Sequence, residues 1–144
     1  MCGEIDEQAM VGQDLLEQAR VMAGMLGVKV GVAPTDHGPA GLADASGRAA
    51  YMDKVFNTGL ASALADMNSA AEDEVVDVVA SRAIALARLT GFMAGQLPPE
   101  ADLFRAVIEA VTAGHAEPAR LVEAYRKKHD HHHGSDHDHH HHDH

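Results

Sequence analysis

The chain has 144 residues, a single cysteine and a formal net charge of −11 with neutral histidines. This length suits one domain, and a single cysteine excludes the intrachain disulfides typical of small secreted proteins. The acidic balance disfavours binding to nucleic acid or to a membrane surface, because both attract basic patches. No apolar run approaches the ~20 residues that cross a bilayer, and the acidic first residues do not resemble a signal peptide. We therefore expect a soluble cytoplasmic protein.

The composition favours helices over strands. Aromatic residues make up only 3% of the chain and tryptophan is absent. A core built from Ala, Val, Leu and Met suits closely packed helices better than a sheet. We therefore predict an all-α fold, with a four- to five-helix bundle in residues 1–128 and a disordered His/Asp-rich tail in residues 129–144.

The first two predicted helices are separated by a long loop. Apolar residues at helical spacing predict a helix over residues 5–26, with Gly27 as its stop. Residues 28–47 are rich in glycine and proline. Residues 28–32 alternate like a strand, but no second strand is evident to pair with them, so we expect an extended loop. The second helix is predicted over residues 48–66, and its many small side chains would let a neighbour approach closely.

The third predicted helix is the most apolar. It begins at Ser69, where Ser69 and Glu72 have the spacing of a capping box, and it runs to about residue 93. Only a narrow polar stripe interrupts its apolar surface, so we expect it to lie at the centre of the bundle. The second and third helices would also fit a homodimer, in which a partner subunit covers both.

Two shorter helices complete the predicted body. Proline is favoured in the first turn of a helix, so Pro99 indicates the start of the fourth helix, and Gly114 is a natural stop. The fifth helix is predicted to begin near Pro118. Its Glu123 and Lys127 are spaced for an ion pair one turn apart.

The sharpest feature of the sequence is its last sixteen residues, which hold ten of the twelve histidines together with four aspartates. The segment has no apolar residue, so we expect it to be disordered without metal. Neutral imidazole is a good ligand for nickel, zinc, cobalt and copper. The predicted metal ligands are His129, His131, His132, His133, His137, His139, His140, His141, His142 and His144.

This ligand set indicates metal storage, buffering or delivery rather than catalysis. Many imidazoles in a pliable chain impose no fixed coordination geometry, and each can be replaced by a neighbour, which suits storage, buffering or delivery. Catalysis needs a fixed geometry with an open position. We therefore expect a non-enzymatic protein that binds divalent transition metal, namely nickel, zinc or cobalt with copper also accommodated. Its role would be to store or buffer the metal, or to deliver it to a client metalloprotein.

The tail resembles the His/Asp-rich extensions of nickel-handling proteins, such as the urease accessory metallochaperone and hydrogenase maturation proteins. This resemblance covers residues 129–144 only, and it implies metal binding without specifying a pathway. No function is carried over from it to residues 1–128.

Two alternatives for the tail remain open at this stage. It could be a purification tag, which Gly134 and Ser135 would suit, although a tag is usually an unbroken run of six histidines and the longest run here is four. It could also be incidental to a helical protein-interaction or regulatory module, whose function would lie on the bundle surface or in the loop of residues 28–47.

Other candidate ligands have simpler explanations. His37 beside Asp36 is expected to be a solvated loop histidine, and Cys2 an inert thiol near the terminus. We expect His115 to cap the last carbonyls of the fourth helix. The acidic group of Glu72, Asp73, Glu74 and Asp77 is explained by its place at a helix start, where negative charge is favoured. No catalytic constellation and no phosphate-binding glycine motif is present.

Overall fold

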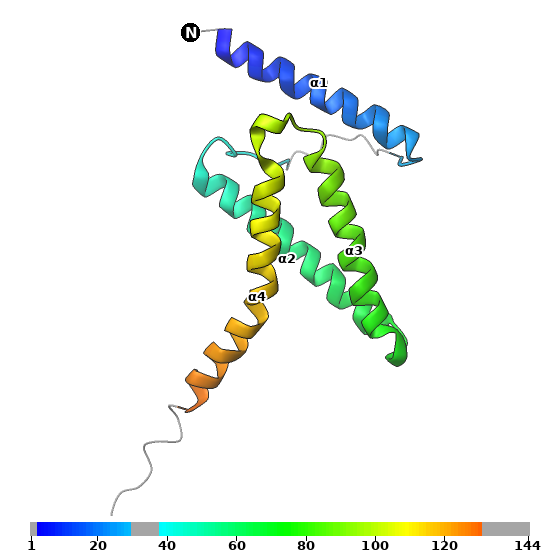
Figure 1. The fold of residues 1–144 in the computed structure, drawn as a ribbon, viewed down its shortest axis with the longest axis vertical. Coiled ribbons are helices and arrows are strands. Elements are labelled where there is room, and N and C mark those ends of the chain that lie inside the picture. Colours follow the sequence, from blue (N-terminus) through cyan, green and yellow to red (C-terminus); the bar gives the residue numbers. More distant parts are fainter. Residues whose placement is uncertain (1–2, 30–37, 131–144) are drawn as a thin grey trace, which may run out of the picture. The chain divides into compact units, whose positions relative to one another are not determined.

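The computed structural model describes residues 3–29 and 38–130 (Figure 1). Within these residues all regular structure is helical and there is no strand, which confirms the all-α prediction. The elements are α1 (Gly3–Met25), α2 (Ala45–Ser69), the 3₁₀ turn η1 (Glu72–Glu74), α3 (Val75–Ala94), the 3₁₀ turn η2 (Pro99–Ala101) and α4 (Leu103–Asp130). The chain divides into two units, the first ending at Pro98 and the second beginning at Pro99.

Helix α1 ends as the sequence predicts. Gly27 has a φ of 74°, in the left-handed region that favours glycine. This conformation lets the Val28 amide donate a 2.9 Å hydrogen bond to the Ala23 carbonyl, which closes a Schellman motif. The predicted extended loop follows, but residues 30–37 lie outside the described residues.

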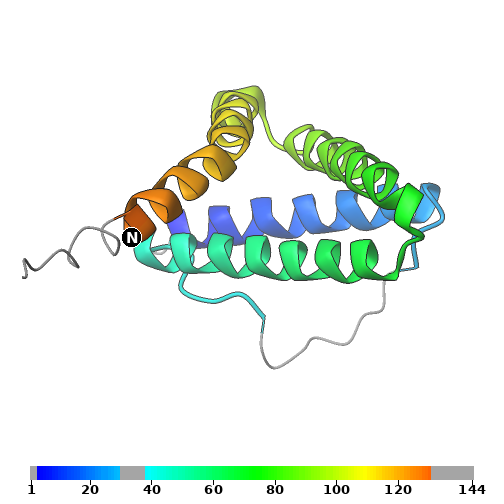
Figure 2. The ribbon, with the colours of Figure 1, turned by 90° about the horizontal axis from the view of Figure 1, so that it is seen from below.

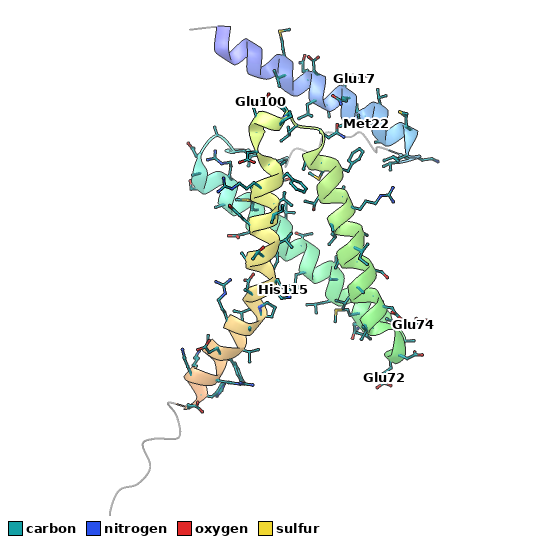
Figure 3. All side chains as sticks on the ribbon, viewed as in Figure 1. Glu17, Met22, Glu72, Glu74, Glu100 and His115 are labelled. Atoms are coloured by element: carbon teal, nitrogen blue, oxygen red, sulfur yellow. The ribbon has the colours of Figure 1, made fainter. Side chains whose placement is uncertain are left out.

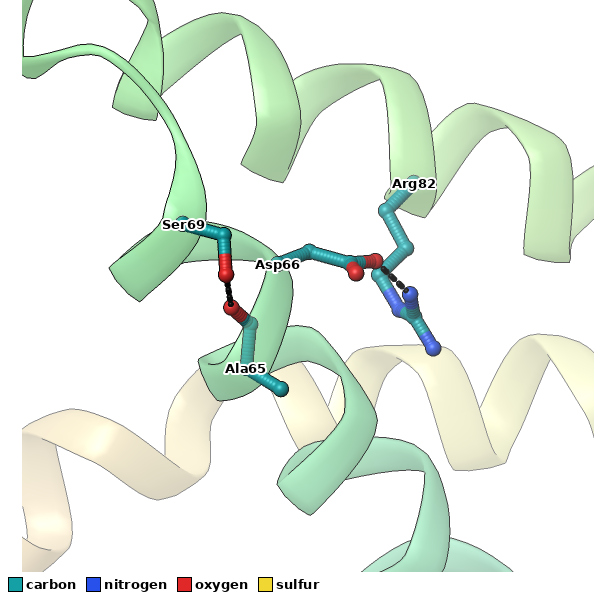
Figure 4. Close-up of polar contacts among 4 residues, drawn as sticks. All are labelled: Ala65, Asp66, Ser69 and Arg82. Carbon is teal, nitrogen blue, oxygen red and sulfur yellow. Dashed lines mark hydrogen bonds and ion pairs between the residues drawn. The ribbon is translucent and has the colours of Figure 1, made fainter.

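Helices α2 and α3 form a hairpin connected through η1 (Figure 2). The predicted capping box at Ser69 is wrong. Helix α2 continues to Ser69, and the Ser69 hydroxyl donates a 2.8 Å hydrogen bond to the Ala65 carbonyl of its own helix (Figure 4). Serine can satisfy its hydroxyl in this way inside a helix as well as at an N-cap. No side-chain cap is made at the start of α3, which begins six residues later at Val75.

One ion pair joins the two helices of the hairpin. The Arg82 guanidinium of α3 donates to the Asp66 carboxylate of α2 (Figure 4). The Asp66 side chain is 57% exposed and that of Arg82 is 26% exposed. Because the pair is open to solvent on the Asp66 side, its contribution to stability is small.

The apolar stripes of the helices are present, but they are not buried. Among residues 10–29 and 38–130, no side chain is buried. Val76 is 78% exposed and Ile84 is 71% exposed, although both lie on the most apolar helix, α3. The expectation that the third helix occupies the centre of a buried core is therefore not met in the described part of the chain.

Helix α4 replaces the two predicted C-terminal helices. It runs without interruption through Gly114 and Pro118 to Asp130. Gly114 does not have the positive φ of a glycine stop, and a Cβ added to it would meet nothing within 4 Å. Pro118 lies inside the helix, although it lacks the amide that would bond to the carbonyl four residues earlier. The prediction of two separate helices was wrong because glycine and proline often end a helix but do not always do so.

None of the helices described is long and apolar enough to span a membrane.

Candidate metal-binding tail and the end of helix α4

The tail begins on the last turn of α4. Helix α4 includes His129 and Asp130, the first two residues of the His/Asp-rich segment. The same turn carries Lys127 and Lys128, and positive charge is favoured at the negative end of the helix dipole. The Lys127 ammonium forms an ion pair with the Glu123 carboxylate one turn earlier, with 2.9 Å between Nζ and Oε1, as predicted from their spacing. These interactions support the helix up to the first histidine of the tail.

His129 is held against an aromatic side chain. Its ring lies on that of Tyr125, with ring centroids 4.3 Å apart and ring planes at 52° to each other. The two residues are four apart, so they share one face of α4. His129 is nevertheless exposed, which leaves its imidazole accessible to an ion from solvent.

Only one of the ten predicted ligands lies in the described part of the chain, and it is His129. The other nine fall outside the described residues: His131, His132, His133, His137, His139, His140, His141, His142 and His144. Within residues 3–29 and 38–130, no group of three or more His, Cys, Asp or Glu side chains is arranged to hold a metal ion. A metal site at this end of the molecule would therefore draw its further ligands from the tail itself.

The remaining histidine of the described body does not cap a helix. His115 lies in the interior of α4, twelve residues after its start at Leu103, and is exposed (Figure 3). The capping role predicted for it was wrong because α4 does not end at Gly114. The predictions for Cys2, Asp36 and His37 concern residues outside those described.

The acidic group occupies the α2–α3 connection, as its sequence position indicated. Glu72 and Glu74 bound the turn η1, and Asp77 lies in the first turn of α3 (Figure 3). Carboxylates at a helix start are favoured by the positive end of the dipole. Their arrangement does not form a metal-binding group.

An apolar groove, which the sequence did not reveal, lies between the end of α1 and helix α3. It has a volume of about 1030 Å³, and its walls include Met22, Met25, Ile84 and Phe92. Just beyond the end of α3, the Gln96 side-chain amide donates a 3.2 Å hydrogen bond to the Met22 sulfur of α1. The apolar stripes of both helices were evident in the sequence, but periodicity does not say which stripes face each other.

Comparisons with protein-family models, with curated proteins and with solved structures gave no match to this chain.

Proposed function

We propose that this protein binds divalent transition metals through residues 129–144 and serves their storage, buffering or delivery. The observation that carries the proposal is the concentration of ten histidines in sixteen residues, beginning with the exposed His129 on the last turn of α4. Nickel, zinc and cobalt all accept imidazole nitrogen, and copper binds such ligands more tightly still.

The proposed chemistry is coordination without catalysis. Four aspartates among the histidines can supply oxygen ligands, or can accept a hydrogen bond from the far nitrogen of a ligating imidazole. Because many equivalent ligands follow one another, a bound ion can exchange one imidazole for the next. This property favours release to a client metalloprotein over permanent retention.

The decisive experiment is a calorimetric titration of Ni²⁺, Zn²⁺, Co²⁺ and Cu²⁺ into the full-length protein at pH 7.5. The matched control replaces the ten tail histidines with asparagine, which preserves chain length and polarity. We expect several ions to bind to the natural chain and tight binding to disappear in the control. Tight sites that persist in the control would refute the proposal, because they would lie outside the tail histidines.

A second candidate function is a helical protein-interaction module with an incidental tail. The number of exposed large apolar side chains on α2 and α3 favours it, since exposed apolar surface can mark an interface. A second copy of the chain could cover this surface, giving a homodimer. Light scattering of the full-length protein and of I84Q distinguishes the cases: a dimer that dissociates in the variant supports this function, and a natural chain that is monomeric at micromolar concentration opposes the homodimer.

A further inference from the structure

The apolar groove between the end of α1 and helix α3 carries one positive charge. Most of its lining is aliphatic, thioether or aromatic, and includes Met22, Leu26, Ile84 and Phe92. In the described part of the chain, Arg88 is the single charged residue of this lining, and no carboxylate belongs to it. The chain as a whole has the opposite balance, with 22 acidic residues against 11 lysines and arginines. The groove therefore combines an apolar surface with a local charge that runs against the composition of the protein.

Arg88 lies within the apolar face of α3. Ile84 precedes it by four residues and Phe92 follows it by four, and both also line the groove. Residues four apart share one face of a helix, so the aliphatic stem of Arg88 adjoins two large apolar side chains. Arg88 is nevertheless exposed, as expected of a basic side chain that extends its charged end toward solvent.

The Arg88 guanidinium has no anionic partner among residues 3–29 and 38–130. None of the ion pairs formed between described residues includes it. Asp77 is the one carboxylate of α3, and it lies about three helical turns away. The other arginine of α3, Arg82, is by contrast paired with Asp66 of α2. The Arg88 guanidinium can therefore accept an anion from solution without breaking an ion pair of the described chain.

A ligand that matches both features has an aliphatic body and one carboxylate. A guanidinium binds a carboxylate through two parallel hydrogen bonds, which makes arginine well suited to this group. The groove volume of about 1030 Å³ lies at the upper end of the range for small-molecule sites, which is roughly 300–1,000 Å³. Its α3 wall, from Ser81 to Phe92, is roughly 16 Å long at the rise of an α-helix. These dimensions accommodate an acyl chain of medium length.

We propose that this groove binds a medium-chain fatty acid, with the carboxylate on Arg88 and the acyl chain against the apolar walls of α1 and α3. The acyl chain would cover surface that the described chain leaves open to solvent, since Met25 is 82% exposed and Ile84 is 71% exposed. Removing this surface from water supplies the affinity, and the charge pair with Arg88 selects an acid over a neutral chain of the same length. The site lies apart from the His/Asp-rich tail and does not depend on the proposed metal-binding function.

The test is calorimetric titration of decanoate into the full-length protein, in a buffer with EDTA so that the tail histidines hold no metal. The ligand control is 1-decanol, which has the same chain length and no charge. The test variant R88M removes the guanidinium but keeps an apolar side chain in the groove. The matched control R20M also removes one positive charge, from a position on α1 that does not belong to the groove lining.

We expect the natural chain to bind decanoate saturably, and more tightly than 1-decanol. R88M should weaken decanoate binding about tenfold and leave 1-decanol binding unchanged, because only the acid loses a charge-assisted contact. R20M should change neither affinity by more than about twofold, since distant charges are screened by salt. No saturable binding at millimolar decanoate, or an equal loss for both ligands in R88M, would overturn the inference. Either result would leave the metal-binding function standing, because these variants keep every tail histidine.

A second pair of variants tests the location of the acyl chain. Ala85 lines the groove and Ala87 of the same helix does not, so A85F fills the groove while A87F adds the same side chain outside it. We expect A85F to lose binding of both ligands and A87F to keep it. Equal decanoate affinity in the two variants would place the ligand elsewhere and contradict the site. A natural chain that is dimeric in light scattering and takes up no decanoate would show that a second copy covers the groove instead.

Discussion

Replacing Pro118 with alanine should stabilise helix α4. Pro118 lies well inside the 28-residue helix and has no amide to donate to the Gly114 carbonyl. Near this position the Arg120 guanidinium donates a 3.4 Å hydrogen bond to the Ala113 carbonyl, a side-chain contact outside the regular backbone pattern. Alanine is favoured over proline in a helix interior by about 3 kcal/mol, so P118A should raise the free energy of unfolding by an amount of this order.

The measurement is urea unfolding of the full-length protein followed by circular dichroism, with hydrogen exchange of the amides near position 118. The control is E117A, a neighbouring alanine substitution that keeps Pro118. We expect the control to change stability by less than about 0.5 kcal/mol, as surface substitutions usually do. In P118A, the backbone amides on both sides of position 118 should exchange more slowly.

The sign of the effect separates two structures for this segment. If Pro118 instead occupied the first turn of a separate helix, its missing amide would cost nothing and its fixed φ would be favourable. P118A would then be neutral or slightly destabilising. That result would refute the continuous helix and with it the placement of His129 at the end of one long α4.

Three further predictions follow from particular contacts and ligands. G27A should lower the free energy of unfolding by about 1–2 kcal/mol, because Gly27 has a φ of 74°; an unchanged melting temperature would contradict the Schellman ending of α1. R82M should cost no more than about 1 kcal/mol, and the loss should shrink in 1 M NaCl, since Asp66 is largely exposed; a salt-independent loss would point to packing instead. Metal uptake should be high at pH 7.5 and fall as the pH drops through about 6.5, because protons and metal compete for the same imidazole nitrogens; equal uptake at pH 5 and pH 7.5, measured by dialysis, would exclude the histidines as ligands.

The features that the sequence predicted correctly depend on interactions between residues close in the chain. The left-handed Gly27 and the Glu123–Lys127 ion pair each follow from residue type and a fixed spacing. The helical class follows from periodicity repeated over long segments. Such features can be predicted without knowing which other elements pack against them.

The features that the sequence missed arise where one residue type has two common uses. Ser69 can cap the next helix or bond back into its own, and the structure takes the second course. Pro118 can begin a helix or be carried inside one, and the choice depends on the whole of α4. The pairing of α1 with α3 around the apolar groove depends on tertiary contacts that periodicity does not specify.

For the candidate metal site, the sequence contributes more than the structure does. The metal-binding proposal for the tail comes almost entirely from composition, namely from ten histidines in sixteen residues. What the structure adds is the continuation of α4 to Asp130 and the contact between His129 and Tyr125. These two observations place the first predicted ligand, His129, on an exposed helical turn beside Tyr125.

Equilibrium dialysis against Ni²⁺ at pH 7.5, with elemental analysis of the bound metal, tests the central claim most directly. The natural chain should retain more than one ion per molecule, and the variant with asparagine at all ten tail histidines should retain none. Equal retention by the two proteins would contradict the account, because the metal would then be bound without the residues proposed to hold it.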